Sequence, residues 1–159
     1  MLALVTAAAI IAAQTLPADL VDLLSKPVSC RTLAGSRSHW YPARQGDTLK
    51  VVNVVEPDVG RRFILVDRYD FDPARRTWHV ILGADSPLEV VADAPPWTTK
   101  RWELAGRDER KAAVRVYYEL VDATTFRRSF ARERAPGDGD WMTTSTSLCA
   151  LGDTAPLYR

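Results

Sequence analysis

The feature that most constrains the fold is a succession of short apolar or alternating runs that occupies the chain from residue 28 onward. Turn-forming residues separate neighbouring runs at nearly every join, as at Gln45-Gly46-Asp47 and Gly106-Arg107-Asp108. No second helical periodicity appears, so the runs are typical of strands joined by short antiparallel connections. We predict about ten short strands, at the following positions: 28–34, 37–43, 48–56, 61–71, 76–83, 87–92, 99–105, 111–121, 125–134 and 140–149.

Strands that are joined by hairpins, without crossover helices, form either a sandwich or a closed barrel. The two cysteines favour closure, because Cys30 lies in the first run and Cys149 in the last. A meander barrel brings its first and last strands side by side, whereas a Greek-key sandwich does so only incidentally. We therefore expect an all-β protein, an antiparallel up-and-down β-barrel of about ten strands with one short N-terminal helix.

The expected helix occupies residues 14–27. Thr15 or Gln14 is suited to begin it, and Pro27 prevents its continuation. Its apolar positions recur at helical spacing: Leu16, Leu20, Leu23 and Leu24.

The segment before this helix has the character of a secretory signal peptide. Residues 1–13 contain one polar side chain, that of Thr6, and no charged side chain precedes Asp19. The apolar run is shorter than the ~20 residues that cross a membrane. We expect the segment to be cleaved, the mature chain to lack a membrane span, and the protein to be periplasmic or extracellular. The alternative is a buried or interfacial N-terminal helix in a cytosolic protein.

The two cysteines lie close to the two ends of the mature chain. In an oxidising compartment, Cys30 and Cys149 are natural disulfide partners. Two unpaired structural thiols are the alternative. A catalytic redox pair is disfavoured, because the C-x-x-C spacing is absent.

The composition indicates a single globular domain, which we assign to residues 28–150, with a C-terminal tail over 151–159. The 21 basic and 20 acidic side chains leave a net charge of +1. Such a balance provides no field that attracts nucleic acid. We expect no nucleic-acid partner.

Sequence motifs for catalysis and metal binding are absent. The chain has neither G-x-S-x-G nor a glycine-rich phosphate loop, and the acidic stretches 67–72 and 137–140 do not match the calcium-loop pattern. His39 and His79 have no neighbour at metal-ligand spacing. We predict no catalytic residue, no metal and no cofactor. A single haem ligand at His79, or an enzyme built from polar groups inside the barrel, are the alternatives.

One strand combines a cation with an apolar face. Phe126, Arg128 and Phe130 alternate along the run 125–134 and so share a face. If that face is interior, an unpaired guanidinium there is costly, so Arg128 needs a carboxylate partner or an anionic ligand. The alternative is a bulged strand, or a side chain that extends to the rim.

The aromatic residues supply the other candidate ligand contacts, because a barrel of this size can hold one small molecule. Alternation places Trp78, Trp102 and Tyr118 inward, although most such positions are expected to be plain core. Trp97 follows two prolines and is suited to rim a barrel mouth. The full set of candidates is Trp78, Trp97, Trp102, Tyr118, Phe126, Arg128 and Phe130.

A series of motifs spread over residues 28–150 resembles a known family. After the cysteine of the first strand come Phe71-Asp-Pro-Ala-Arg-Arg-Thr-Trp78, Lys100-Arg-Trp-Glu-Leu104, Thr125-Phe-Arg-Arg-Ser-Phe130 and Trp141-Met-Thr-Thr-Ser-Thr-Ser-Leu-Cys149. This order resembles the small secreted bacterial proteins of the DUF1579 or lipocalin-like type. The resemblance implies a calycin-like β-barrel of unsettled biochemical role. The run Ala94-Pro-Pro-Trp97 departs from the glycine-rich turn of such proteins.

We expect the barrel to act as a non-catalytic binding or carrier module for a small apolar or amphipathic molecule. The alternative is an envelope structural or interaction protein whose barrel is filled by its own side chains. The interior volume discriminates between them, because ligand pockets typically reach ~300 Å³ or more and a packed barrel has no such void.

Overall fold

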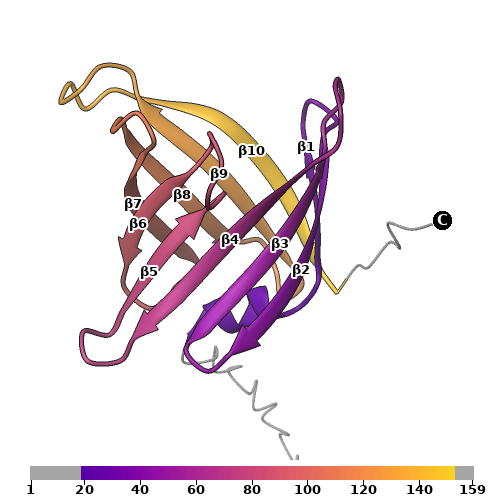
Figure 1. Ribbon diagram of the computed structural model, residues 1–159, viewed down its shortest axis with the longest axis vertical. Coiled ribbons are helices and arrows are strands. Elements are labelled where there is room, and N and C mark those ends of the chain that lie inside the picture. Colours follow the sequence, from indigo (N-terminus) through magenta and orange to yellow (C-terminus); the bar gives the residue numbers. More distant parts are fainter. Residues whose placement is uncertain (1–18, 153–159) are drawn as a thin grey trace, which may run out of the picture.

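The computed structural model describes residues 19–152 as one closed antiparallel barrel (Figure 1). Each strand pairs with its neighbours in the chain, and the first strand pairs with the last. The predicted up-and-down barrel is therefore confirmed, and the sandwich alternative is wrong. The strands are β1 (Val28–Thr32), β2 (Arg37–Gln45), β3 (Thr48–Glu56), β4 (Phe63–Asp72), β5 (Thr77–Leu82), β6 (Val90–Ala94), β7 (Arg101–Asp108), β8 (Ala113–Leu120), β9 (Thr125–Glu133) and β10 (Trp141–Leu151).

The helix that precedes the barrel lies within the range that the sequence predicted. It is a 3-10 helix, η1 (Leu20–Ser25), and the expected first residues of the longer helix lie outside the described part of the chain, as do the signal-peptide segment and residues 153–159. Asp19 is its N-cap, since its side chain accepts a hydrogen bond from the Val21 N–H. Leu20, Val21 and Leu24 are buried, so η1 closes one end of the barrel (Figure 1).

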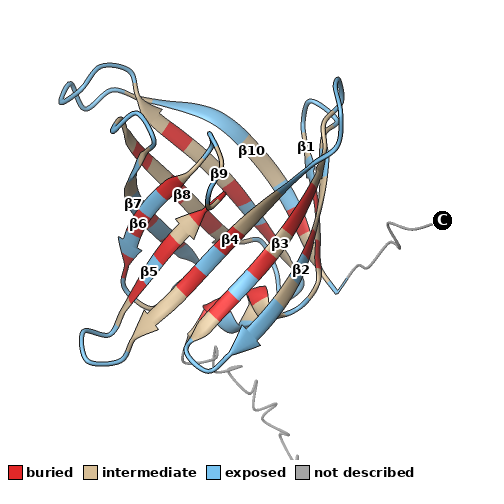
Figure 2. Cartoon of the chain, viewed as in Figure 1, coloured by how far each residue is buried: buried red, intermediate tan, exposed pale blue. Residues whose placement is uncertain are grey.

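Burial alternates along the strands, as Figure 2 shows. In β5, Trp78, Val80 and Leu82 point inward and are buried, whereas His79 between them is exposed. This period of two separates an interior face from a solvent face on a pleated strand. Over residues 19–152, no helix is long and apolar enough to cross a membrane.

A disulfide joins the two strands that close the barrel. Cys30 and Cys149 are directly opposite in the pairing of β1 with β10, and their sulfur atoms are bonded at 2.13 Å. Neither thiol is free. The predicted pairing is confirmed, and the barrel is fastened covalently at its seam.

Candidate functional site

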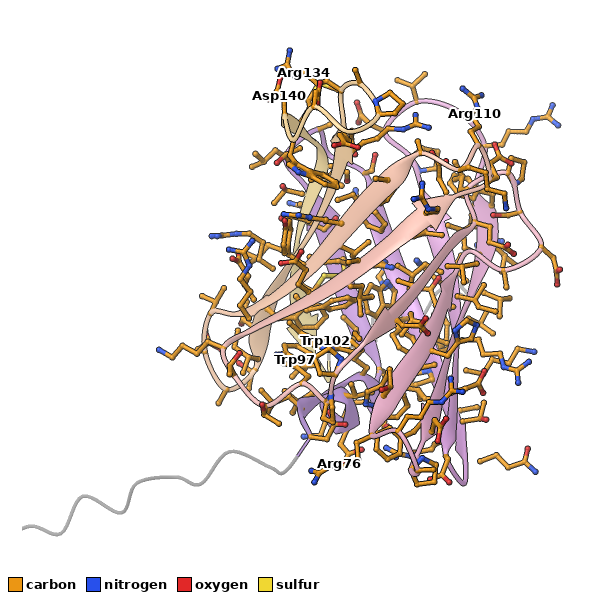
Figure 3. The ribbon with its side chains drawn as sticks, turned by 90° about the vertical axis from the view of Figure 1, so that its left-hand side faces the viewer. Arg76, Trp97, Trp102, Arg110, Arg134 and Asp140 are labelled. Atoms are coloured by element: carbon orange, nitrogen blue, oxygen red, sulfur yellow. A yellow bond between two sulfur atoms is a disulfide. The ribbon has the colours of Figure 1, made fainter. Side chains whose placement is uncertain are left out.

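The half of the barrel next to η1 is filled by an aromatic cluster. Trp97 and Trp102 stack with ring centroids 5.7 Å apart and planes at 7°, and Tyr118 lies 5.5 Å from Trp102 (Figure 3 labels the two tryptophans). Every ring of the cluster is almost completely buried. We define the aromatic cluster as Trp40, Tyr69, Trp78, Trp97, Trp102, Tyr118 and Phe126.

The Asp19 carboxylate ties η1 to this cluster. One oxygen accepts hydrogen bonds from the backbone N–H of Val21 at 3.0 Å and of Trp97 at 3.1 Å, and the other accepts from the Trp78 indole at 2.6 Å. The backbone N–H of Leu20 donates to the Trp97 carbonyl at 2.7 Å. These bonds satisfy the backbone N–H groups of Leu20, Val21 and Trp97, which are buried where η1 meets the barrel. We call this half of the molecule the closed half.

The other half of the barrel, the open half, contains a cavity of about 340 Å³. The cavity has two kinds of wall. Strands β3 to β6 form an apolar wall with Val55, Leu65, Leu82 and Val90. Strands β1, β2 and β10 form a hydroxyl wall with Thr32, Ser38, Ser145 and Ser147.

Three polar side chains lie deep in this cavity, and we call them the polar layer: Asn53, Asp67 and Arg128. All are buried, with exposed fractions of 4%, 1% and 7%. The Arg128 guanidinium donates to the Asp67 carboxylate at 3.3 Å, and the Gly83 N–H donates to the same carboxylate at 2.8 Å. Arg128 thus points inward, the case for which the sequence required a partner, and it has the carboxylate partner that a buried guanidinium requires.

Arg128 also connects the two halves through its neighbours. Its guanidinium carbon lies 4.8 Å from the ring centroids of Trp40 and Phe130, and 5.5 Å from that of Tyr118. Trp40 and Tyr118 belong to the aromatic cluster, whereas Phe130 lines the cavity. Aromatic faces stabilise a cation at such distances, so this environment compensates part of the lost hydration.

The electrostatics of the polar layer follow from its burial. Loss of hydration raises the pKa of the Asp67 carboxyl, while the charge of Arg128 and the Gly83 N–H counteract part of that rise. Burial alone would lower the pKa of Arg128, but the influence of Tyr118, Asp67 and Tyr69 raises it above its ordinary value. The guanidinium is therefore a permanent cation.

Two polar atoms of the layer have no hydrogen-bond partner within residues 19–152. They are Nε of Arg128, a donor, and Oδ1 of Asn53, an acceptor. Both residues line the cavity. A buried polar group without a partner is uncommon in folded proteins and is destabilising, so a ligand group that reached these atoms would gain a hydrogen bond from each.

The predicted site residues divide between the two halves. Arg128 and Phe130 line the cavity. Trp78, Trp97, Trp102, Tyr118 and Phe126 belong to the aromatic cluster and are not part of the cavity lining. The expected position of Trp97 at a barrel mouth is wrong, because the loop after β6 folds inward and hydrogen-bonds to η1. Ligand contact by any of the seven stays a prediction.

Sequence reasoning missed Asp67 and Asn53. A usable signal existed, because Asp67 alternates with Leu65 and Tyr69 and thus shares their interior face. Asn53 likewise lies between the inward residues of β3. The stretch 67–72 does not match the calcium-loop pattern, and its informative feature is a single acid on an otherwise apolar face.

The histidines lie outside the barrel interior. His79 Nδ1 is 2.8 Å from the Asp93 carboxylate on the exposed face, and His39 Nδ1 is 3.0 Å from the Ser29 hydroxyl. In the described part of the chain, no three His, Cys, Asp or Glu residues form a group that could hold a metal ion.

Comparison with protein-family models gives no match for this chain, and comparison with curated proteins gives none either. The structure itself is a closed ten-stranded antiparallel barrel that is compatible with a lipocalin-like fold.

Proposed function

We propose that the protein is a non-catalytic binding or carrier module, which holds one small apolar or amphipathic molecule in its open half. The cavity of about 340 Å³ carries this proposal. Its volume lies within the range of small-molecule sites, which begins at ~300 Å³. It combines apolar walls with a few convergent polar groups, and that combination is typical of ligand pockets.

The two ends of the barrel support a single route of entry. The helix η1 and the aromatic cluster fill one end, whereas the described residues place no helix over the other (Figure 1). Phe63 and Leu88 line the cavity and remain partly exposed at that second end, with exposed fractions of 39% and 60%. A ligand would therefore enter between the hairpin loops and stop at the polar layer.

We also propose that the protein is exported and belongs to the DUF1579 or lipocalin-like type. The Cys30–Cys149 disulfide supports export, because such bonds persist in oxidising compartments. The meander closure of the barrel supports the family assignment.

The second candidate function is a structural or interaction protein that binds no small molecule. The aromatic cluster favours it, because half of the interior is already filled by the chain's own side chains. The two candidates differ in whether the open half is occupied when the protein is taken from its own compartment.

Native mass spectrometry of the protein purified from that compartment, beside a denatured sample, tests the proposal. We expect an extra mass that disappears on denaturation. Leu65→Trp should abolish the extra mass, because the indole would fill the cavity from β4. The matched control is Leu148→Trp, at a 54% exposed position on β10. An absence of any extra mass would favour the structural candidate instead.

A further inference from the structure

The chemistry of the polar layer defines the kind of ligand that fits the cavity. Arg128 offers an unused N–H donor through Nε, and Asn53 offers an unused acceptor through Oδ1. A ligand group that satisfies both atoms must accept one hydrogen bond and donate another. Hydroxyl and primary amide groups do this, whereas an ionised carboxylate is an acceptor only.

The charges of the polar layer also favour an uncharged ligand group over an anionic one. Arg128 is already paired with Asp67, so the two buried charges cancel. Besides this pair, the part of the cavity lining that the structure describes contains one charged residue, Arg37, which is exposed. An anion at the polar layer would meet the Asp67 carboxylate together with Arg128, and would leave one negative charge buried in excess. Burying such a charge is unfavourable.

The walls constrain the rest of the ligand. The apolar wall is contributed by Val55, Leu65, Leu82 and Val90, and the hydroxyl wall lies along β1, β2 and β10. On that wall, Ser145 and Ser147 add hydroxyl groups to the cavity lining. A molecule with an apolar body and an uncharged polar end fits these surroundings better than an ionised one.

We infer that the cavity selects an uncharged amphipathic molecule, whose buried end carries a group that both accepts and donates a hydrogen bond. This inference rests on the proposed binding function and specifies its ligand class. The Arg128–Asp67 pair then excludes anionic amphiphiles, and the two unpartnered atoms recognise the neutral end group.

Three probes of equal chain length test the inference on the full, disulfide-bonded protein by titration calorimetry at neutral pH. Decanamide accepts and donates, methyl decanoate only accepts, and decanoate carries a charge. We expect decanamide to bind most tightly, and decanoate to bind about tenfold more weakly or worse, because its charge is buried without compensation. Methyl decanoate should lie between them, since it leaves Asn53 Oδ1 without a donor.

Asp67→Asn should reverse this order. The substitution preserves the shape of the side chain and its ability to accept from the Gly83 N–H, but leaves Arg128 as an unpaired cation. Decanoate should then bind about tenfold more tightly than decanamide. The matched control is Asp70→Asn on the same strand, where the carboxylate is 2.7 Å from Arg68 and from the Thr48 hydroxyl, outside the cavity lining.

The outcomes separate the inference from the proposed function. Tighter binding of decanoate than of decanamide by the unmodified protein would overturn the inference and leave the carrier function standing. Failure of all three probes to bind would overturn both. If Asp67→Asn does not fold, the ranking of the three probes on the unmodified protein still decides.

Discussion

The closed and open halves are built from the same strands, yet one is filled and the other is hollow. On β2 and β10, the inward side chains become smaller toward the open end. In β2, Trp40 of the closed half is followed toward the open end by Ser38, and in β10, Cys149 is followed in the same direction by Ser147. A strand pattern of period two therefore defines the interior face, while residue volume decides whether that interior is core or cavity.

The disulfide lies where the two halves meet, and its loss has the largest expected effect. Cys149 is completely buried in the core, whereas Cys30 also lines the cavity. The bond closes a sequence separation of 119 residues. Reduction should lower the free energy of unfolding by about 4–5 kcal/mol and the melting temperature by about 10–20 °C. Thermal unfolding with and without reductant measures this.

Hydrogen exchange would sharpen that result. After reduction, the amides of β1 and β10 in the open half should exchange faster than those beside the aromatic cluster, because packing still holds the closed half together. The Cys30→Ser, Cys149→Ser double variant is the control and should match the reduced protein. An unchanged melting temperature on reduction would contradict a stabilising role for the Cys30–Cys149 disulfide.

Truncating one aromatic side chain in each half tests the comparison directly. Trp97→Ala should cost about 3–5 kcal/mol in unfolding free energy, because the ring is completely buried and stacked on Trp102. Phe130→Ala should cost only about 1 kcal/mol, because its ring is half-buried beside the cavity. Urea unfolding curves give both values.

Trp97→Phe is the matched control for the closed half. The Trp97 indole N–H has no hydrogen-bond partner within residues 19–152, so this substitution loses no hydrogen bond and should cost less than Trp97→Ala. Equal costs for Trp97→Ala and Phe130→Ala would mean that the two halves are packed alike.

The sequence predicted the strands well because their signals are local. Alternation and turn residues define a strand without knowledge of its neighbours, and Cys30 with Cys149 linked the first strand to the last. Alternation likewise placed Arg128 on one face with its flanking phenylalanines, whereas the interior position of that face comes from the structure.

The division into two halves could not be predicted, because it depends on long-range register. Asp67 meets Arg128 only because β4 and β9 bring them to the same level of the barrel, across a separation of 61 residues. The position of Trp97 is likewise set by hydrogen bonds to Asp19, which lies 78 residues away in the chain. No local pattern contains these pairings.

The smallest expected effect comes from pH and concerns the tyrosine pair of the closed half. The hydroxyls of Tyr69 and Tyr118 are 2.9 Å apart, and both side chains are completely buried. Loss of hydration is the main cause that raises the pKa of each above its ordinary value of 10.0. In the unfolded chain both ionise near pH 10, whereas in the barrel they keep their protons. Their contribution to stability is therefore complete below about pH 10 and is lost as the pH rises further.

The free energy of unfolding should accordingly be level from about pH 8 to 9.5 and fall above about pH 10. The Tyr69→Phe, Tyr118→Phe double variant should be slightly less stable at neutral pH, because it lacks one buried hydrogen bond, yet its stability should decline less in alkali. Tyr117→Phe on the opposite face of β8 is the control and should keep the full decline. A decline that is the same in the double variant and in the unmodified protein would mean that burial of this tyrosine pair is not the cause of the alkaline sensitivity.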